Sequence, residues 1–140
     1  MVDSSKLLEP KIREDVIGAL GHFKYSYNKV RQIDFSAEWD EQTLETLESF
    51  ASRFARLSDL FIARFLRSKI LQSDPGFRGT LIDSLNMSEK LGLLESAEDW
   101  RRIRELRNIA AHEYSADDFR HLYSELLRLS PRLLNIEKQL

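Results

Sequence analysis

One apolar pattern limits most strongly what this chain can fold into. Between residues 41 and 72, large apolar side chains return every three or four positions, which is the spacing of one helix face. The members of this stripe are Leu44, Leu47, Phe50, Phe54, Leu57, Phe61 and Phe65, and Leu60, Ile62, Leu66 and Ile70 widen it. So wide an apolar surface on a long helix predicts more than one packing neighbour, and a second copy of the chain is one candidate.

A similar period precedes this segment. Apolar side chains at steps of three and four predict a first helix that begins near Pro10, because proline is tolerated in a first helical turn. Its stripe consists of Val16, Leu20, Phe23, Tyr27 and Val30. Residues 32–41, QIDFSAEWDE, separate it from the long second helix.

Three short signals organise the remainder of the chain. The pairs Thr80 and Asp83, Ser96 and Asp99, and Ser115 and Asp118 have the spacing of a capping box. They predict helices that begin near residues 81, 97 and 116, with apolar faces that include Trp100, Ile103, Leu106 and Ala110, and then Phe119, Leu122, Leu126, Leu129 and Leu133.

Glycine and proline mark where these helices should end or change. Gly92 suits the C-terminal end of the third helix, and Pro131 should kink the last helix or restart it with Ser130 as the cap. No segment alternates with a period of two. We therefore expect an all-α, up-and-down bundle of four to five helices, as a single domain over residues 1–140.

Composition excludes several classes of function. The chain has no cysteine, which excludes disulfides, zinc–thiolate sites and a thiol nucleophile. No segment has the length or apolarity of a signal peptide or a membrane span, so we expect a soluble, cytoplasmic protein with no membrane partner. The formal net charge is −2, so any contact with nucleic acid must come from a local basic patch.

The residues best suited to chemistry lie in the stretch RNIAAHEY, residues 107–114, where one helix should give way to the next. Asn108 and His112 share a helix face, but Arg107 and His112 are about 140° apart on an ideal helix. Either the helix unwinds before His112, or two chains pair and each contributes half of a shared cleft.

These residue types suit phosphodiester chemistry. A histidine can act as general base or acid near neutral pH, and an arginine fork binds phosphate oxygens and stabilises charge that develops at phosphorus. Asn108 can orient either side chain. Tyr114 can bind substrate, stack on a base or be a modification target. On the preceding turns, Arg101, Arg102 and Arg104 can supply a local positive field for an RNA backbone.

Structural explanations compete with each of these roles. His112 can interact with the helix dipole, Arg107 can pair with Glu105, Glu113 or another acid, and Tyr114 can pack beside the Ser115 cap. Asn108 can be an ordinary polar helix residue.

The other polar residues have simpler interpretations. The arginine run is most simply a solvated face, with Glu95, Glu98 and Asp99 in reach. His22 and His121 have no companion motif and are expected to be structural or exposed. A zinc-protease H-E-x-x-H is incomplete because Ala116 stands where its second histidine would be, so we expect no metal.

Arg107, Asn108, His112 and Tyr114 match the R-x-x-x-x-H-x-Y motif of the HEPN superfamily. The chain most resembles HepT-type toxins, and the helical layout agrees with that family across nearly the whole length. The resemblance implies a helical-bundle homodimer whose two motifs share one cleft, acting as an endoribonuclease that needs no metal or other cofactor. His112 would then activate the ribose 2′-hydroxyl or protonate the leaving oxygen, and Arg107 would hold the scissile phosphate.

The resemblance also implies a partner. HepT-type toxins are paired with minimal nucleotidyltransferase antitoxins, which silence them by binding and by transferring AMP to the motif tyrosine, here Tyr114. Two other hypotheses stay open. The chain can be a non-catalytic helical partner that presents substrate to, or regulates, a nucleotidyltransferase, or it can be a structural dimer that keeps the motif for its hydrogen bonds.

Overall fold

The apolar stripe forms one long helical unit in the computed structural model, which describes residues 4–111 and 116–140 and the side chains of residues 9–111 and 119–140. This unit, the central helix, consists of α2 (Glu41–Asp59), the π-helical segment η1 (Leu60–Leu66) and α3 (Arg67–Ser73). Its bounds confirm the predicted helix over residues 41–72. The π-helical segment in its middle was not predicted.

A local hydrogen bond starts the central helix where the sequence predicted. The side chain of Asp40 is the N-cap and accepts a hydrogen bond from the backbone N–H of Thr43, with an N–O distance of 2.7 Å. Glu41 in the first turn adds negative charge where the helix dipole favours it. The pKa of Asp40 is lowered, first by hydrogen bonding to the Thr43 side chain and then to the Thr43 backbone N–H, because the ionised carboxylate is the better acceptor.

The stripe is buried within this single chain. Leu47, Phe50, Phe54, Leu57, Phe61 and Phe65 are all buried, whereas Leu44 and Leu60 are half-buried at its margins. The central helix contacts α1 (Ser4–Val30), α4 (Leu81–Lys90), α5 (Ala97–Ala110) and α6 (Ala116–Leu134). The prediction of several neighbours is therefore confirmed, and they come from the chain itself.

The start of the first helix corrects the sequence prediction. Helix α1 begins at Ser4, and Pro10 lies inside it instead of in its first turn. Proline cannot donate the backbone hydrogen bond expected at that position, which costs helix stability. Contacts with α3 hold the same turn, because the Glu9 carboxylate accepts hydrogen bonds from Lys69 Nζ and from Gln72 Nε2.

The caps of α4 and α5 follow the sequence with one difference. Thr80 and Asp83 make both bonds of a capping box, and Gly92, at φ 77°, ends α4 as predicted. Ser96 accepts a hydrogen bond from the N–H of Asp99, but the Asp99 carboxylate pairs with Arg132 Nε at 2.7 Å. A distant partner thus replaces the second half of the predicted box.

Helix α6 also begins where it was predicted, while its Ser115 cap lies outside the described residues. It passes through Pro131 to Leu134 and continues as the 3₁₀ segment η2 (Asn135–Gln139). Ser130 is buried, and its hydroxyl bonds to the carbonyl of Leu126 at 2.7 Å. Ser130 therefore does not cap a new helix, because its hydroxyl bonds backwards within α6.

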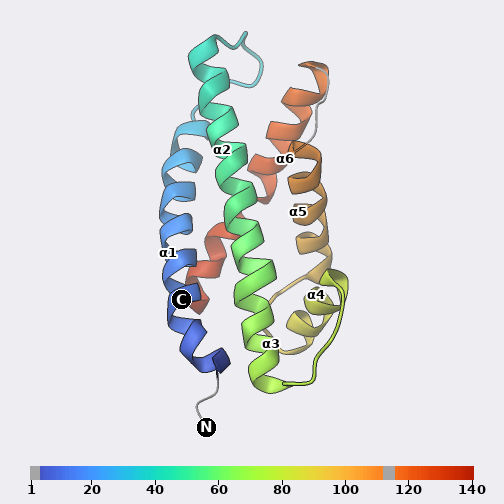
Figure 1. The fold of residues 1–140 in the computed structure, drawn as a ribbon. Coiled ribbons are helices and arrows are strands. Elements are labelled where there is room, and N and C mark those ends of the chain that lie inside the picture. The colour runs from blue at the N-terminus through green and yellow to red at the C-terminus, as the bar shows by residue number, and fades with distance from the viewer. Residues whose placement is uncertain (1–3, 112–115) are drawn as a thin grey trace.

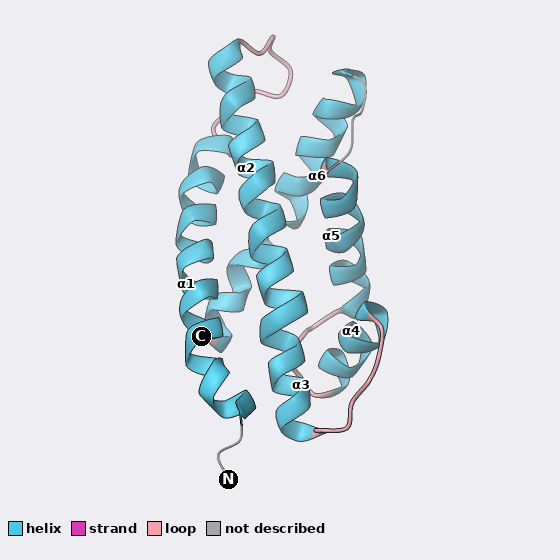
Figure 2. Ribbon diagram, viewed as in Figure 1, coloured by secondary structure: helices cyan, strands magenta, loops and turns pink. Residues whose placement is uncertain are grey.

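The long helices run alternately up and down (Figure 1). α1 ascends, the central helix descends, and α5 and α6 complete the bundle, while the short α4 lies at the lower end beside α3. Helices account for most of the described chain, and the described residues contain no strand (Figure 2). The predicted all-α bundle is confirmed. None of the described helices is long and apolar enough to cross a bilayer.

Truncating Phe54 should destabilise the bundle strongly. Phe54 is fully buried, and its ring centroid lies 6.1 Å from that of Phe23. Phe54→Ala should lower the free energy of unfolding by about 3–5 kcal/mol, measured by urea denaturation. The matched control is Ile82→Ala on α4, where the side chain is 51% exposed. A similar loss in both variants would contradict this account of the core.

Candidate functional site

Arg107 is fixed at the C-terminal end of α5 by one acid of the central helix. Its Nε lies 3.0 and 3.1 Å from Asp59 Oδ1 and Oδ2, and its Nη2 lies 2.8 Å from Oδ2. This is the forked geometry in which a guanidinium and a carboxylate pair most specifically. The contact raises the pKa of Arg107, chiefly through the hydrogen bond to Asp59 and then through its charge.

Asp59 holds a second arginine as well. Arg104 Nη1 lies 3.0 Å from Asp59 Oδ1, so two guanidinium groups share one carboxylate. Arg104, Arg107 and Asp59 are all partly exposed, and together they carry a net charge of +1. This excess favours a phosphate near the end of α5.

The position of Asp59 in the central helix is also unusual. It is the last residue of α2, and the π-helical segment begins at Leu60. π-helical turns are rare and are often found at functional sites. The sequence patterns did not predict a role for Asp59. Its only local signal is a charge within the apolar run LSDLFIARF, residues 57–65, and its partner Arg107 lies 48 positions away.

Arg107 lines a cavity of about 310 Å³ between α2, α5 and α6. Small side chains form much of its wall, including Ala51, Ser52 and Ala55 of α2, together with Ala110. Asp59 occupies Arg107 Nε and Nη2, which leaves Nη1 without an acceptor among the described residues. The N–H groups of Nη1 are therefore available to an acceptor oxygen that the described chain does not supply.

The lining contains features beyond Arg107 and the small residues. Glu48 contributes a carboxylate, which would repel an anion, so an anion should bind at the Arg107 side. The buried Tyr123 forms part of the wall from α6.

The other members of the predicted motif are only partly placed. Asn108 is exposed, and no side-chain hydrogen bond orients it toward Arg107 in the described structure. His112 and Tyr114 lie outside the described residues. Helix α5 ends at Ala110, with Ala111 as its C-cap. The two alternatives stated for Arg107 and His112, unwinding of the helix or pairing of two chains, both stay predictions.

The arginine run on α5 is engaged by acids. Arg101 pairs with Glu98, at 3.5 Å, and bonds to Asn86 Oδ1 at 2.9 Å. Arg102 pairs with Glu105 at 2.8 Å and with Glu125 at 3.4 Å. Glu95, Glu98 and Asp99 were predicted to lie within reach of these arginines, and among them only Glu98 pairs with one. Arg101, Arg102 and Arg104 therefore remain a predicted RNA contact whose charges are already partly compensated.

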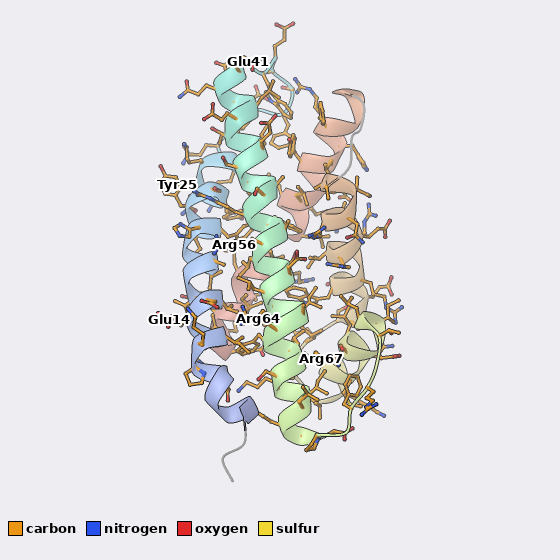
Figure 3. All side chains as sticks on the ribbon, viewed as in Figure 1. Glu14, Tyr25, Glu41, Arg56, Arg64 and Arg67 are labelled. Atoms are coloured by element: carbon orange, nitrogen blue, oxygen red, sulfur yellow. The ribbon has the colours of Figure 1, made fainter. Side chains whose placement is uncertain are left out.

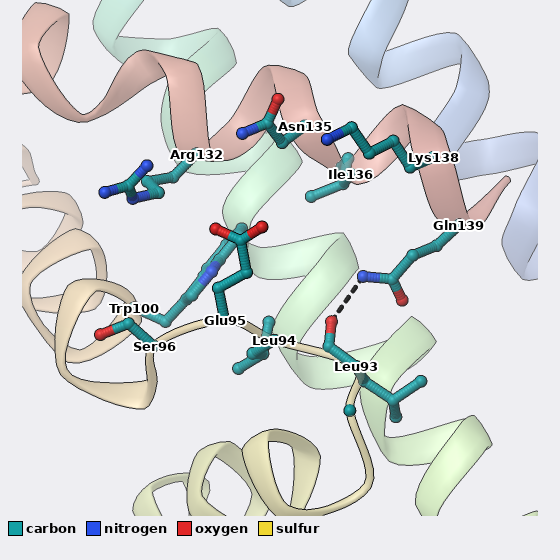
Figure 4. Close-up of a pocket in the computed structure, with 11 residues that line it drawn as sticks. Leu93, Leu94, Glu95, Ser96, Trp100, Arg132, Asn135, Ile136, Lys138 and Gln139 are labelled. Carbon is teal, nitrogen blue, oxygen red and sulfur yellow. Dashed lines mark hydrogen bonds between the residues drawn. The ribbon is translucent and has the colours of Figure 1, made fainter.

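A second cavity lies at the opposite end of α5 (Figure 4). It measures about 240 Å³, and Trp100 and Ile136 line it together with charged Glu95 and Lys138. Gln139 Nε2 donates to the carbonyl of Leu93 and ties η2 to the loop before α5 (Figure 4). This cavity contains none of the predicted site residues. In the described part of the chain, no group of three or more metal-ligating side chains gathers.

The chain matches no family model, no curated protein and no solved structure. The resemblance to HEPN proteins therefore depends on the motif and the helical layout, and its functional implications are proposals.

A double-mutant cycle should detect the Asp59–Arg107 contact. Because both side chains are about one-third exposed, Asp59→Asn combined with Arg107→Gln should give a coupling energy of about 0.5–1 kcal/mol in urea unfolding. The coupling should shrink in 1 M salt, where charges are screened over about 3 Å. A control cycle of Asp59→Asn with the exposed Arg78→Gln should show none. Coupling within error for both pairs would contradict the contact.

Proposed function

We propose that this chain is the toxin component of a toxin–antitoxin pair, a cytoplasmic endoribonuclease that cuts RNA without a metal ion. Arg107 binds the scissile phosphate and His112 transfers protons. The observation that carries the proposal is the Arg107 fork, held by Asp59 beside a cavity at the end of the helix that leads to His112. A preorganised cation stabilises developing phosphate charge because it needs no rearrangement during the reaction.

The proposed reaction is a transfer within the RNA strand. The ribose 2′-oxygen loses its proton to a histidine and attacks the neighbouring phosphorus. The bond from phosphorus to the 5′-oxygen breaks, and that oxygen leaves with a proton. The products are a 2′,3′-cyclic phosphate and a 5′-hydroxyl end. Arg107 binds the non-bridging oxygens, where negative charge builds up.

We propose that the working form is a homodimer in which two motifs share one cleft. One histidine of the pair can then accept the proton while its mate supplies one to the leaving oxygen. Exposed apolar surface at the end of α5 supports a protein contact there, since Ile109 is 39% exposed one residue after Asn108. Asn108 would orient the motif side chains within this cleft.

A minimal nucleotidyltransferase is the proposed antitoxin, and Tyr114 is the proposed acceptor of AMP. Adding a nucleotide two residues after His112 would fill the cleft with a charged group. This modification would compete with the RNA phosphate for Arg107.

A second candidate function has one observation in its favour. Asp59 already takes two of the three nitrogens of Arg107, and Arg104 shares the same acid. That geometry also suits an arginine whose role is to fasten α5 to the central helix. The chain would then be a non-catalytic helical partner of a nucleotidyltransferase, and it would not poison cells when expressed alone.

Replacing Arg107 or His112 should slow cleavage strongly. Arg107→Ala and His112→Ala should each slow cleavage of single-stranded RNA by about 10²–10⁴-fold, because each removes a group that acts in the transition state. Arg128→Ala is the matched control, because its exposed side chain on α6 pairs with Glu125. Gel-resolved cleavage by purified protein in EDTA is the measurement. Equal cleavage rates in all three variants would contradict the mechanism.

Tyr114→Phe should separate toxicity from silencing. The variant keeps the aromatic ring but lacks the hydroxyl that would accept AMP. Incubation with the partner nucleotidyltransferase and ATP should add the mass of AMP to the wild type and not to Tyr114→Phe, as read by intact-protein mass spectrometry. Growth inhibition by the variant should persist. Modification of the variant to the same extent would show that Tyr114 is not the acceptor.

A further inference from the structure

A basic cluster lies on the face of α2 that adjoins the Arg107 cavity. His22 of α1 and Arg53 and Arg56 of α2 line a small cavity of about 170 Å³ together with Ala19. The described lining contains no acidic residue. Three nitrogen-rich side chains therefore meet in a groove between two helices, and their chemistry suits an anion with several oxygens.

Arg53 is held in a defined position within this cluster. Its Nη1 donates to the carbonyl of His22 at 3.1 Å and to the hydroxyl of Ser26 at 2.9 Å. These bonds use one terminal nitrogen and fasten the guanidinium between α1 and α2. Arg56 is exposed, and no acid of the described chain pairs with it. Arg53, which is fixed, and Arg56, which has no acidic partner among the described residues, thus offer two positive charges to an anion.

An exposed aromatic side chain adjoins the cluster. Tyr25, one turn after His22, is 63% exposed, which is unusual for a large aromatic residue. Arg53 Cζ lies 5.8 Å from the centre of its ring, and Lys29 Nζ lies 5.5 Å from it. Cations flanking an exposed ring are the combination that binds single-stranded nucleic acids, because bases stack on the ring and the cations contact phosphates.

The acids of α1 do not neutralise this cluster. Glu14 and Asp15 lie about two turns before His22. Asp15 is itself engaged by Lys11 at 3.1 Å and by Arg64 at 3.3 Å, which lowers its pKa. Figure 3 shows Glu14 and Arg64 low in the bundle and Tyr25 near the top of α1, with Arg56 between these levels on the central helix.

The two cavities share one stretch of α2. Ser52 and Ala55 line the Arg107 cavity, and Arg53 and Arg56 line the cavity beside α1. Only the width of one helix, about 10 Å, separates them. The intervening surface includes the small, exposed Ser52. A flexible strand can therefore cross α2 closely and contact both cavities.

We propose that the His22–Tyr25–Arg53–Arg56 surface binds single-stranded RNA beyond the scissile phosphate. Arg53, Arg56 and His22 contact a phosphate, and Tyr25 stacks on a neighbouring base. The surface thereby selects unpaired RNA, because bases within a duplex are not free to stack on a side chain. This inference depends on the proposed ribonuclease function for the identity of the ligand.

The test measures binding of a 2′-O-methyl RNA oligonucleotide, which has no 2′-hydroxyl to attack and stays intact. Fluorescence anisotropy should show that Arg56→Gln weakens binding about tenfold and lowers the slope of log affinity against log salt by about 0.7. Tyr25→Ser should also weaken binding about tenfold, without changing that slope. Arg78→Gln, which removes an exposed arginine from the loop before α4, is the matched control.

The outcomes separate this inference from the proposed activity. Wild-type affinity in both variants, equal loss in the control, or tighter binding of the matching duplex would overturn the binding surface. Tighter binding of poly-glutamate than of the oligonucleotide would identify a surface for an acidic protein and would also overturn it. If binding responds as expected but unmodified RNA is not cut, the surface stands and the ribonuclease proposal fails. If both variants cut RNA with an unchanged KM, the ribonuclease proposal stands and the binding surface fails.

Discussion

Burial of the central helix is the constraint on which the rest of this structure depends. Its phenylalanine and leucine side chains contact α1, α5 and α6, so the helix is covered on three sides. Removing this much apolar surface from water is the main favourable term available to an all-helical chain of this size. The remaining strip of the helix carries Ser52, Arg56 and Asp59, which are exposed or half-exposed. The residues proposed to contact RNA therefore lie on or beside the one face that the core leaves open.

Asp59 connects this core to the proposed chemistry. It ends α2 where the helix changes to π geometry, and it fixes Arg107 and Arg104 of α5. An arginine held by an acid of a packed helix stays oriented, whereas a free surface arginine would lose more side-chain entropy on binding. The same contact moderates the charge of Arg107, so phosphate binding would draw on the excess charge of the trio and on the nearby Arg53 and Arg56. Arg56 lies on the same open strip of α2 as Asp59, so a bound strand would need to cross only this strip to contact both groups of arginines.

Local patterns predicted the fold well, and long-range contacts account for the differences. The central helix, the Thr80 cap and the Gly92 stop depend on neighbours within a few residues, so the sequence alone was sufficient. The helix start near Pro10 was wrong because α3 supports an earlier turn through Glu9. Of the candidate site, Arg107 was predicted, but Asp59 was not, since 48 positions separate the two. Arg53 was not predicted for a similar reason, because its contacts Ser26 and Tyr25 belong to another helix.

The ends of the RNA fragments test the central claim most directly. Purified protein would be incubated with RNA in EDTA, and the fragments analysed by mass spectrometry. Attack by the ribose 2′-oxygen, with Arg107 on the phosphate, predicts 2′,3′-cyclic phosphate and 5′-hydroxyl ends that form without a metal ion. Fragments with 5′-phosphate and 3′-hydroxyl ends, formed only when a divalent metal is added, would contradict the account.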